Sequence, residues 1–311
     1  MKLIFMFLLL GLCLLLQACS PSYDSSYAGV VHKHNSTVFV YSESHGSVSI
    51  DIWQLSSTEA SHKKLHSLVI ANQSSYIPKI GYEDSIYLSH SGSTISVNAE
   101  GEISTVSERS YDSFRSLADS EGTCVAVYDD TACLLSLKTG QEIALLGEWK
   151  WSGAYLHKDL LLLWEGSNLE IWNRHTGSVE QVVLDSDILG VGIQSEMLAA
   201  VCLSHLYSYQ LDETMSVHKT RKLDLCTGIV GPFLLRILNE NQIVGCYSLC
   251  YPVVFDLSEA NDGLLDLVVH DCAPAWTYLI PFDDCFIGAV NPSQGDEYEL
   301  LRIPYKELLK Q

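Results

Sequence analysis

The sequence is poor in lysine, arginine and proline. Of its 311 residues only 18 are Lys or Arg and 8 are Pro, against 38 Asp or Glu, and the formal net charge is −20 at pH 7. A chain of this charge repels the phosphate backbone of nucleic acids, so we expect no nucleic-acid partner. The low proline content and the 47% of apolar residues exclude a proline-rich or globally disordered chain and predict a sizeable core.

The local motifs of common enzyme classes are also missing. The chain has no Gly-x-Ser-x-Gly, His-Glu-x-x-His, Walker or dinucleotide-binding motif, no EF-hand loop and no Cys-x-x-Cys pair. We therefore predict no catalytic residue, no cofactor and no metal ligand. An active site assembled from distant parts of the chain would leave no such motif, so an enzyme stays open as an alternative.

A few residue pairs have the composition of a site but also an ordinary structural explanation. His32 and His34 stand two apart and would share one face of a strand, as metal ligands or simply as an exposed face. Turn chemistry accounts for three acidic pairs. These pairs are Asp129 and Asp130, Asp185 and Asp187, and Asp283 and Asp284.

A repeat organises most of the chain. Residues 160–184 read as strand, Gly-Ser-Asn turn, strand, Thr-Gly turn and strand, and imperfect copies recur at intervals of 44, 38, 37, 37, 46 and 46 residues. These intervals lie near the period of a four-stranded propeller blade, about 40 to 45 residues. Equivalent positions in the third strand of each copy are Trp53, Val97, Leu135, Trp172, Tyr209, Phe255 and Leu301.

We therefore predict an all-β chain that forms a seven-bladed β-propeller over residues 28–311, with mostly four strands per blade. The fourth strand is missing after Leu301. Either the segment around Val30 closes the ring by completing the last blade, or the tail supplies a poor strand or a short helical turn. Two stacked β-sandwiches, which also show closely spaced short strands, are the alternative fold.

The repeat resembles those of WD-repeat and quinoprotein-like propellers. Ile52-Trp53 and Ile171-Trp172 are nearest to the Trp-Asp dipeptide, with Gln54 and Asn173 where Asp would stand, and residues 135–140 are similar to the quinoprotein repeat core. We expect the residues at the aligned position to pack between blades and to carry no chemistry.

The N-terminus has the pattern of an export signal. Lys2 precedes fourteen apolar or small residues, Leu3 to Leu16, a run too short to span a bilayer and typical of a signal peptide. Leu16-Gln17-Ala18-Cys19 resembles the lipobox of bacterial lipoproteins. An ordinary secretory signal cleaved after Ala18, or an uncleaved anchor, are the alternatives.

The lipobox resemblance implies a division of the chain and a location. Residues 1–18 would be the signal peptide, Cys19 would carry the lipid, and residues 19–27 would form a polar tether that reaches on the order of 15 Å. Several acyl chains together give a durable membrane anchor. Ser20 after the Cys corresponds to an outer-membrane address if the cell is Gram-negative.

Eight cysteines remain beyond the signal and the anchor, an even number that permits disulfides in an exported protein. Cys124 and Cys133 flank a predicted hairpin, and Cys272 and Cys285 lie on neighbouring predicted strands. We expect these four to be the candidates for bridges, with buried reduced thiols as the alternative.

Taken together, these features predict a membrane-anchored lipoprotein of the cell envelope whose propeller is a scaffold for protein partners. The alternative is a propeller enzyme, a hydrolase or lyase acting on a small ester, sugar or peptide, with a divalent metal in the central channel.

Overall fold

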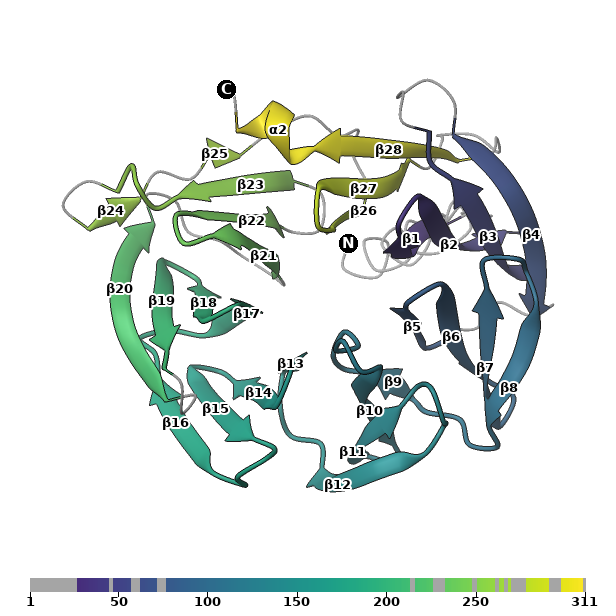
Figure 1. Ribbon diagram of the computed structural model, residues 1–311, viewed down its shortest axis with the longest axis horizontal. Helices are drawn as coiled ribbons and strands as arrows, with labels where there is room; N and C mark the ends of the chain where they lie inside the picture. Colours follow the sequence, from purple (N-terminus) through teal and green to yellow (C-terminus); the bar gives the residue numbers. More distant parts are fainter. Residues whose placement is uncertain are drawn as a thin grey trace, which may run out of the picture.

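The computed structural model describes residues 27–309, apart from 45–46, 57–61, 72–76, 213–215, 226–232, 248–250, 261–262, 266–267, 270–277 and 291–297. Seven small sheets are arranged radially around a central axis (Figure 1). Within each sheet the chain runs from the channel outward through three or four successive antiparallel strands, which we label A to D; one sheet has a further, parallel strand at its outer edge. The predicted seven-bladed β-propeller is confirmed.

Blades 1 to 4 follow the repeat in order. Blade 1 contains β1 (Tyr27–His34), β2 (Thr37–Ser44), β3 (Ser47–Gln54) and β4 (Lys63–Ala71), and blade 2 contains β5 (Lys79–Tyr82), β6 (Ser85–His90), β7 (Ser93–Asn98) and β8 (Ile103–Ser107). Blade 3 contains β9 (Ser113–Phe114), β10 (Thr123–Tyr128), β11 (Thr131–Ser136) and β12 (Glu142–Glu148), and blade 4 contains β13 (Gly153–His157), β14 (Leu160–Glu165), β15 (Asn168–Asn173) and β16 (Val179–Val183).

Blades 5 to 7 are less regular. Blade 5 contains β17 (Ile188–Gln194), β18 (Met197–Cys202), β19 (His205–Leu211) and β20 (Val217–Leu225), with β24 (Leu264–Leu265) added at its outer edge. Blade 6 contains β21 (Phe233–Asn239), β22 (Gln242–Tyr247), β23 (Tyr251–Asp256) and β25 (Val268–Val269). Blade 7 contains β26 (Tyr278–Pro281), β27 (Cys285–Val290) and β28 (Glu299–Pro304), followed by helix α2 (Tyr305–Leu308).

The core of the ring is a set of seven apolar clusters, one between each pair of neighbouring blades. Each residue at the aligned position of the repeat lies in, or packs against, a different one of these clusters. In every case the cluster is the one shared with the preceding blade. The expectation that this position packs between blades is therefore confirmed, and it explains why Trp, Val, Leu, Tyr and Phe all occur there.

The turns of the ring define two faces. The A–B face carries the turns from strand A to strand B, together with those from C to D. The B–C face carries the turns from B to C and the connections between blades. On the B–C face, Asp129 and Asp130 have φ of 44° and 60°, as a two-residue hairpin turn requires at both central positions. The turn explanation of this acidic pair holds.

The last blade has three strands among the described residues, β26, β27 and β28. Among the described residues that follow Leu301 there is no fourth strand, as predicted, and the segment around Val30 does not supply one. Val30 pairs with Val40 in blade 1, where β1 is strand A. After β28 the chain forms the short helix α2, whose Tyr305 and Leu308 are buried between blades 6 and 7.

A second departure from the regular repeat affects residues 264–269. In the structure β24 pairs in parallel with β20 of blade 5, whereas β25 pairs with β23 of blade 6. The segment therefore joins two blades instead of completing one.

The predicted disulfide between Cys124 and Cys133 is not formed, and both residues are buried free thiols. They do lie on adjacent strands, but Cys124 pairs with Leu135 and Cys133 with Ala126. Such diagonal neighbours are about 7–8 Å apart, too far for a bridge whose Cβ atoms lie about 3.5–4.5 Å apart. Cys285 is also a buried free thiol, and Cys272 lies outside the described residues.

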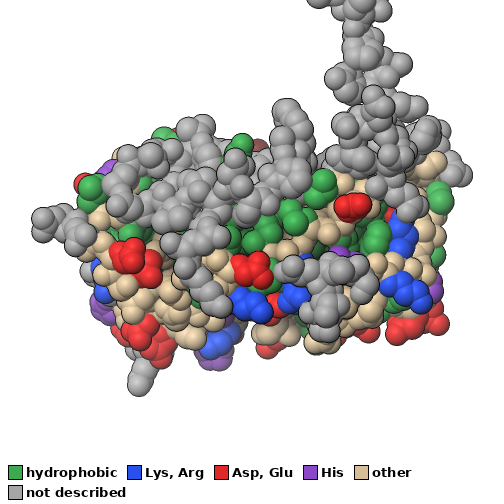
Figure 2. Space-filling view, turned by 90° about the horizontal axis from the view of Figure 1, so that it is seen from above, with side chains coloured by type: hydrophobic (Ala, Val, Ile, Leu, Met, Phe, Trp, Pro, Cys, Tyr) green, Lys and Arg blue, Asp and Glu red, His purple; other side chains and the backbone are tan. Residues whose placement is uncertain are grey.

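The outer wall of the ring exposes aliphatic side chains, and the side of the ring drawn in Figure 2 shows hydrophobic side chains beside charged ones. They come from the outermost strands of several blades because these strands are sheet edges with no further layer outside them. The exposed aliphatic residues of these strands are Leu65, Val69, Ile103, Ile143, Leu145, Val179, Val183 and Leu264.

Candidate functional site

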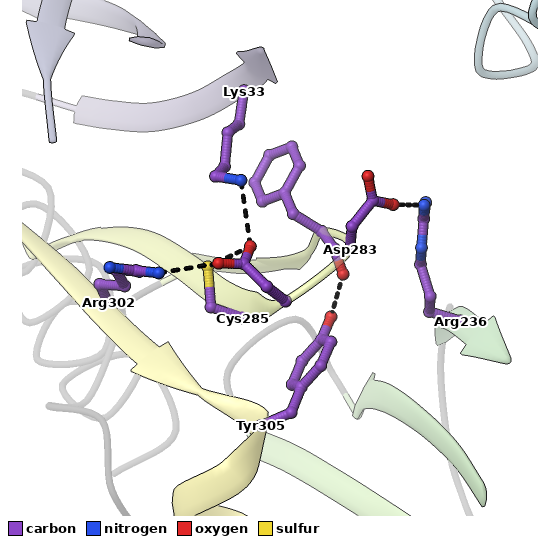
Figure 3. A network of polar contacts seen from close by, with 8 residues as sticks. Lys33, Arg236, Asp283, Cys285, Arg302 and Tyr305 are labelled. Atoms are coloured by element: carbon purple, nitrogen blue, oxygen red, sulfur yellow. Dashed lines mark hydrogen bonds and ion pairs between the residues drawn. The ribbon is translucent and has the colours of Figure 1, made fainter. Parts of the chain in front are cut away.

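The most connected polar site of the described chain lies on the A–B face, at the turn between β26 and β27 (Figure 3). Asp283 and Asp284 occupy this turn. Asp283 forms an ion pair with Arg236 of β21, in blade 6. Asp284 accepts hydrogen bonds from Lys33 of β1 in blade 1, at 3.0 Å, and from Arg302 of β28 in its own blade, at 2.7 Å. One turn thus joins three consecutive blades.

Helix α2 holds the backbone of this turn in place through two hydrogen bonds of Tyr305. The Tyr305 hydroxyl donates to the Phe282 carbonyl, and the Tyr305 N–H donates to the Asp284 carbonyl at 3.1 Å. Tyr305 itself packs edge-on against Phe286. The helix that replaces a fourth strand therefore positions both carboxylates.

Opposing effects act on the ionisation of Asp284. Partial burial alone would raise its pKa, but hydrogen bonds from Lys33 and Cys285, the charge of Lys33 and the hydrogen bond from Arg302 outweigh burial and lower the pKa to about 2. Burial raises the pKa of the neighbouring Cys285 thiol to about 11. The carboxylate is therefore ionised and the thiol protonated at neutral pH, so Cys285 is not an activated nucleophile.

A second ion pair joins blades 3 and 4 on the same face. Asp119, whose side chain is only 1% exposed, contacts Arg174 at 3.0 Å and accepts hydrogen bonds from the N–H groups of Glu121 and Thr123. Arg174 also donates to the carbonyl of Lys158. Like the blade 7 turn, this pair fixes one blade to the next.

Exposed acids surround the A–B face. Each A–B turn of blades 2 to 7 presents at least one, whereas the A–B turn of blade 1 contains Asn35 and Ser36. The exposed acids in these turns are Glu83, Asp84, Glu121, Asp159, Glu196, Glu240, Asp283 and Asp284. We call this set the acidic turns. They give the face a negative rim around the channel.

One member of the histidine pair, His32, contacts other parts of the ring. His32 is partly buried, stacks on Phe39 and lies 2.7 Å from the Glu83 carbonyl, and burial lowers its pKa. Across the described ranges, no group of three or more His, Cys, Asp or Glu side chains is placed to hold a metal ion. Cys19 and its surroundings lie outside the described residues.

Sequence reasoning found the acidic pair at 283–284 but explained it as turn chemistry alone. It missed Lys33, Arg236 and Arg302 because the partners are distant in sequence; Lys33 and Asp284 are 251 residues apart. The residues next to these three basic residues in the sequence do not indicate which acidic residue each one contacts. The only available signal was topological, since a closed ring must bring its last blade beside its first.

With this geometry established, comparison with solved structures is informative. The fold is that of WD40 propellers. The WD40 domain of Neurospora crassa Pan2 has a TM-score of 0.58 at 9% identity, over 87% of this chain and 88% of that chain. Hsv2 of Kluyveromyces lactis has a TM-score of 0.58 at 11% identity, over 89% and 98%. BBS1N, in a complex with ARL6DN, has 0.54 at 10%, over 87% and 88%.

At these identities the likeness shows the fold alone. No family model and no curated protein matches the sequence.

The ion pairs of Asp284 predict a pH-dependent contribution to stability. Replacing Asp284 by Asn should lower the free energy of unfolding at pH 7 by about 1 kcal/mol, after reduction for the 48% exposure of the side chain. Because its pKa is lowered on folding, the stabilisation is present above about pH 4 and is lost as the pH falls towards 2. Urea unfolding across this range measures the difference.

Asp283→Asn is the matched control. Asp283 is 80% exposed and has one ion-pair partner, so its replacement should change stability little at any pH. An equal, pH-independent loss in both variants would contradict the role assigned to Asp284.

Proposed function

We propose that this chain is a lipid-anchored scaffold of a bacterial cell envelope, whose propeller binds other proteins through its A–B face. The observation that carries the proposal is the A–B face itself: a rigid ring that displays turns of different sequence, six of them acidic. Turns held on a rigid body are suited to recognition. A propeller of the same fold, BBS1N, is known in complex with another protein.

The entry point of the chain supports an orientation for this scaffold. Tyr27 begins β1 opposite Glu43, near the end of β2 that leads into the B–C turn. The chain therefore enters the ring on the B–C face. If Cys19 carries lipid, residues 19–27 tether this face to the membrane, and the A–B face points into the surrounding solution.

The charge of the A–B face indicates the chemistry of a partner. A negative rim attracts a basic surface and accelerates its encounter with the ring. The same charge keeps the ring off an anionic leaflet, which agrees with attachment by lipid and not by the protein surface. No helix in the described ranges is both long and apolar enough to cross a membrane.

The enzyme alternative receives no specific support from the described residues. The polar side chains at the blade 7 turn are joined in ion pairs between blades, and the nearby thiol is protonated. We therefore favour the scaffold.

Site-specific photo-crosslinking in cells tests the partner. A photoreactive amino acid at Glu121 or Glu240 should give a discrete crosslinked protein, because both residues are exposed on the A–B face. The same group at Ser204, exposed on the B–C face, is the control and should give none. Crosslinks from Ser204 alone would contradict the proposed binding face.

Metabolic labelling tests the anchor. Cells fed an alkyne fatty acid should incorporate label into the wild-type chain, and Cys19→Ala should abolish it because the thiol is the lipid attachment site. Cys13→Ala, in the predicted signal peptide, should leave both labelling and membrane fractionation unchanged. A labelled, membrane-bound Cys19→Ala protein would disprove the lipobox assignment.

A further inference from the structure

A small pocket opens between blades 3 and 4, beside the connection between these blades and the B–C turn of blade 4. Its volume is about 230 Å³, below the roughly 300–1,000 Å³ typical of pockets for drug-sized ligands. It therefore suits a single side chain or a ligand of that size. The residues that determine its chemistry are Lys150, Trp151, Glu165, Asn168, Glu170 and Gln181.

Strand register places the four polar residues of blade 4 on one face. Glu165 pairs with Asn168, and Glu170 pairs with both Leu163 and Gln181. Residues directly opposite one another in a sheet share a face. Leu163 is buried in the cluster between blades 3 and 4, so this face looks towards blade 3. The side chains on this face are apolar near the channel, and those nearer the outer edge of the blade carry carboxylate and amide groups.

One aromatic residue, Trp151, lines the pocket, and its side chain is mostly buried in the cluster between blades 3 and 4. Trp151 packs edge-on against Trp149, with ring centroids 5.6 Å apart. The Lys150 ammonium lies 5.1 Å from the Trp151 ring, and the Arg115 guanidinium lies 5.4 Å from the Trp149 ring. Such separations are those of cation–π contacts.

The carboxylates of the pocket are not neutralised by the protein. Glu170 accepts one hydrogen bond from the Trp172 indole at 3.1 Å. Within the described part of the chain, neither Glu165 nor Glu170 has an ion-pair partner, and Lys150 pairs with no acid. Two carboxylates face one exposed lysine, which leaves the pocket negative.

We propose that this pocket binds an arginine side chain of a protein partner. A guanidinium is planar and carries five donors, so it pairs with two carboxylates at once. The amide oxygens of Asn168 and Gln181 accept its remaining N–H groups. The inference rests on the proposed function that the propeller binds proteins. Because the pocket lies beside the B–C turn of blade 4, it adds a contact that is separate from the acidic turns of the A–B face.

An NMR titration of the folded chain with N-acetyl-arginine methylamide tests the pocket. The Trp151 indole N–H signal should shift with the arginine probe, and should shift little with the citrulline analogue, which has the same shape without the charge. The lysine analogue should bind more weakly because an ammonium lacks the planar fork. The double variant E165Q/E170Q should weaken arginine binding about tenfold or more.

The double variant E108Q/E299Q removes two charges from exposed glutamates outside the pocket and outside the acidic turns, and it is the control, with unchanged binding expected. Equal shifts from arginine and citrulline, or equal affinity for the lysine analogue, would overturn the assignment to arginine. Equal weakening by the control variant would show attraction by net charge only. Shifts of the same indole by a neutral sugar but not by arginine would assign the pocket to another ligand.

The result of the arginine titration can be distinguished from the result of the photo-crosslinking. A chain that captures a partner through the A–B face but ignores the arginine probe contradicts only the pocket. A chain that binds the probe but yields no crosslinked protein contradicts only the scaffold.

Discussion

The structure depends on the contact between its last and first blades. Every other pair of neighbouring blades is joined by the chain itself, whereas blades 7 and 1 are held by side chains. Their apolar cluster includes Trp53 and Tyr298. The Tyr298 hydroxyl lies within this cluster, accepts from the Trp53 indole at 2.8 Å and donates to Asp51 at 2.6 Å. On the A–B face, Lys33 and Asp284 add an ion pair.

This mode of closure follows from the missing fourth strand of blade 7. Because β1 is strand A of blade 1, the N-terminal strand is not available to complete the last blade. Buried polar contacts replace the backbone pairing that a shared strand would give. Asp51 is 3% exposed, so its carboxylate depends on the Tyr298 hydroxyl and on Lys64, 3.4 Å away. Removing a partner from such a group leaves a costly buried charge.

The repeat in the sequence predicted the architecture well, because a blade is a local unit. Spacing and turn residues located the third strand of every blade, and even the missing strand after Leu301. Prediction failed where pairing is not local. The two-residue offset between Cys124 and Cys133, the sharing of residues 264–269 between two blades, and the contacts of Asp51 and Asp284 all depend on register or ring closure. Short-range patterns carry no information about these.

The two faces of the ring differ in what they offer. The A–B face combines rigid ion-paired turns with exposed carboxylates, while the chain enters on the B–C face. The proposed scaffold needs rigid turns that expose side chains to a partner. The turn of blade 7 has both properties, because Asp283 and Asp284 join the blades and also lie exposed at the rim.

The free energy of unfolding of Tyr298→Phe tests the closing contact most directly. The variant removes one hydroxyl and keeps the ring, so it should cost about 1–3 kcal/mol by leaving Asp51 without its buried donor. Tyr155→Phe is the control. Its hydroxyl makes only a long contact of 3.5 Å with the Ile193 carbonyl, between two blades that the chain itself joins. Closure through side chains predicts a clearly larger loss for Tyr298→Phe; equal losses in the two variants would contradict it.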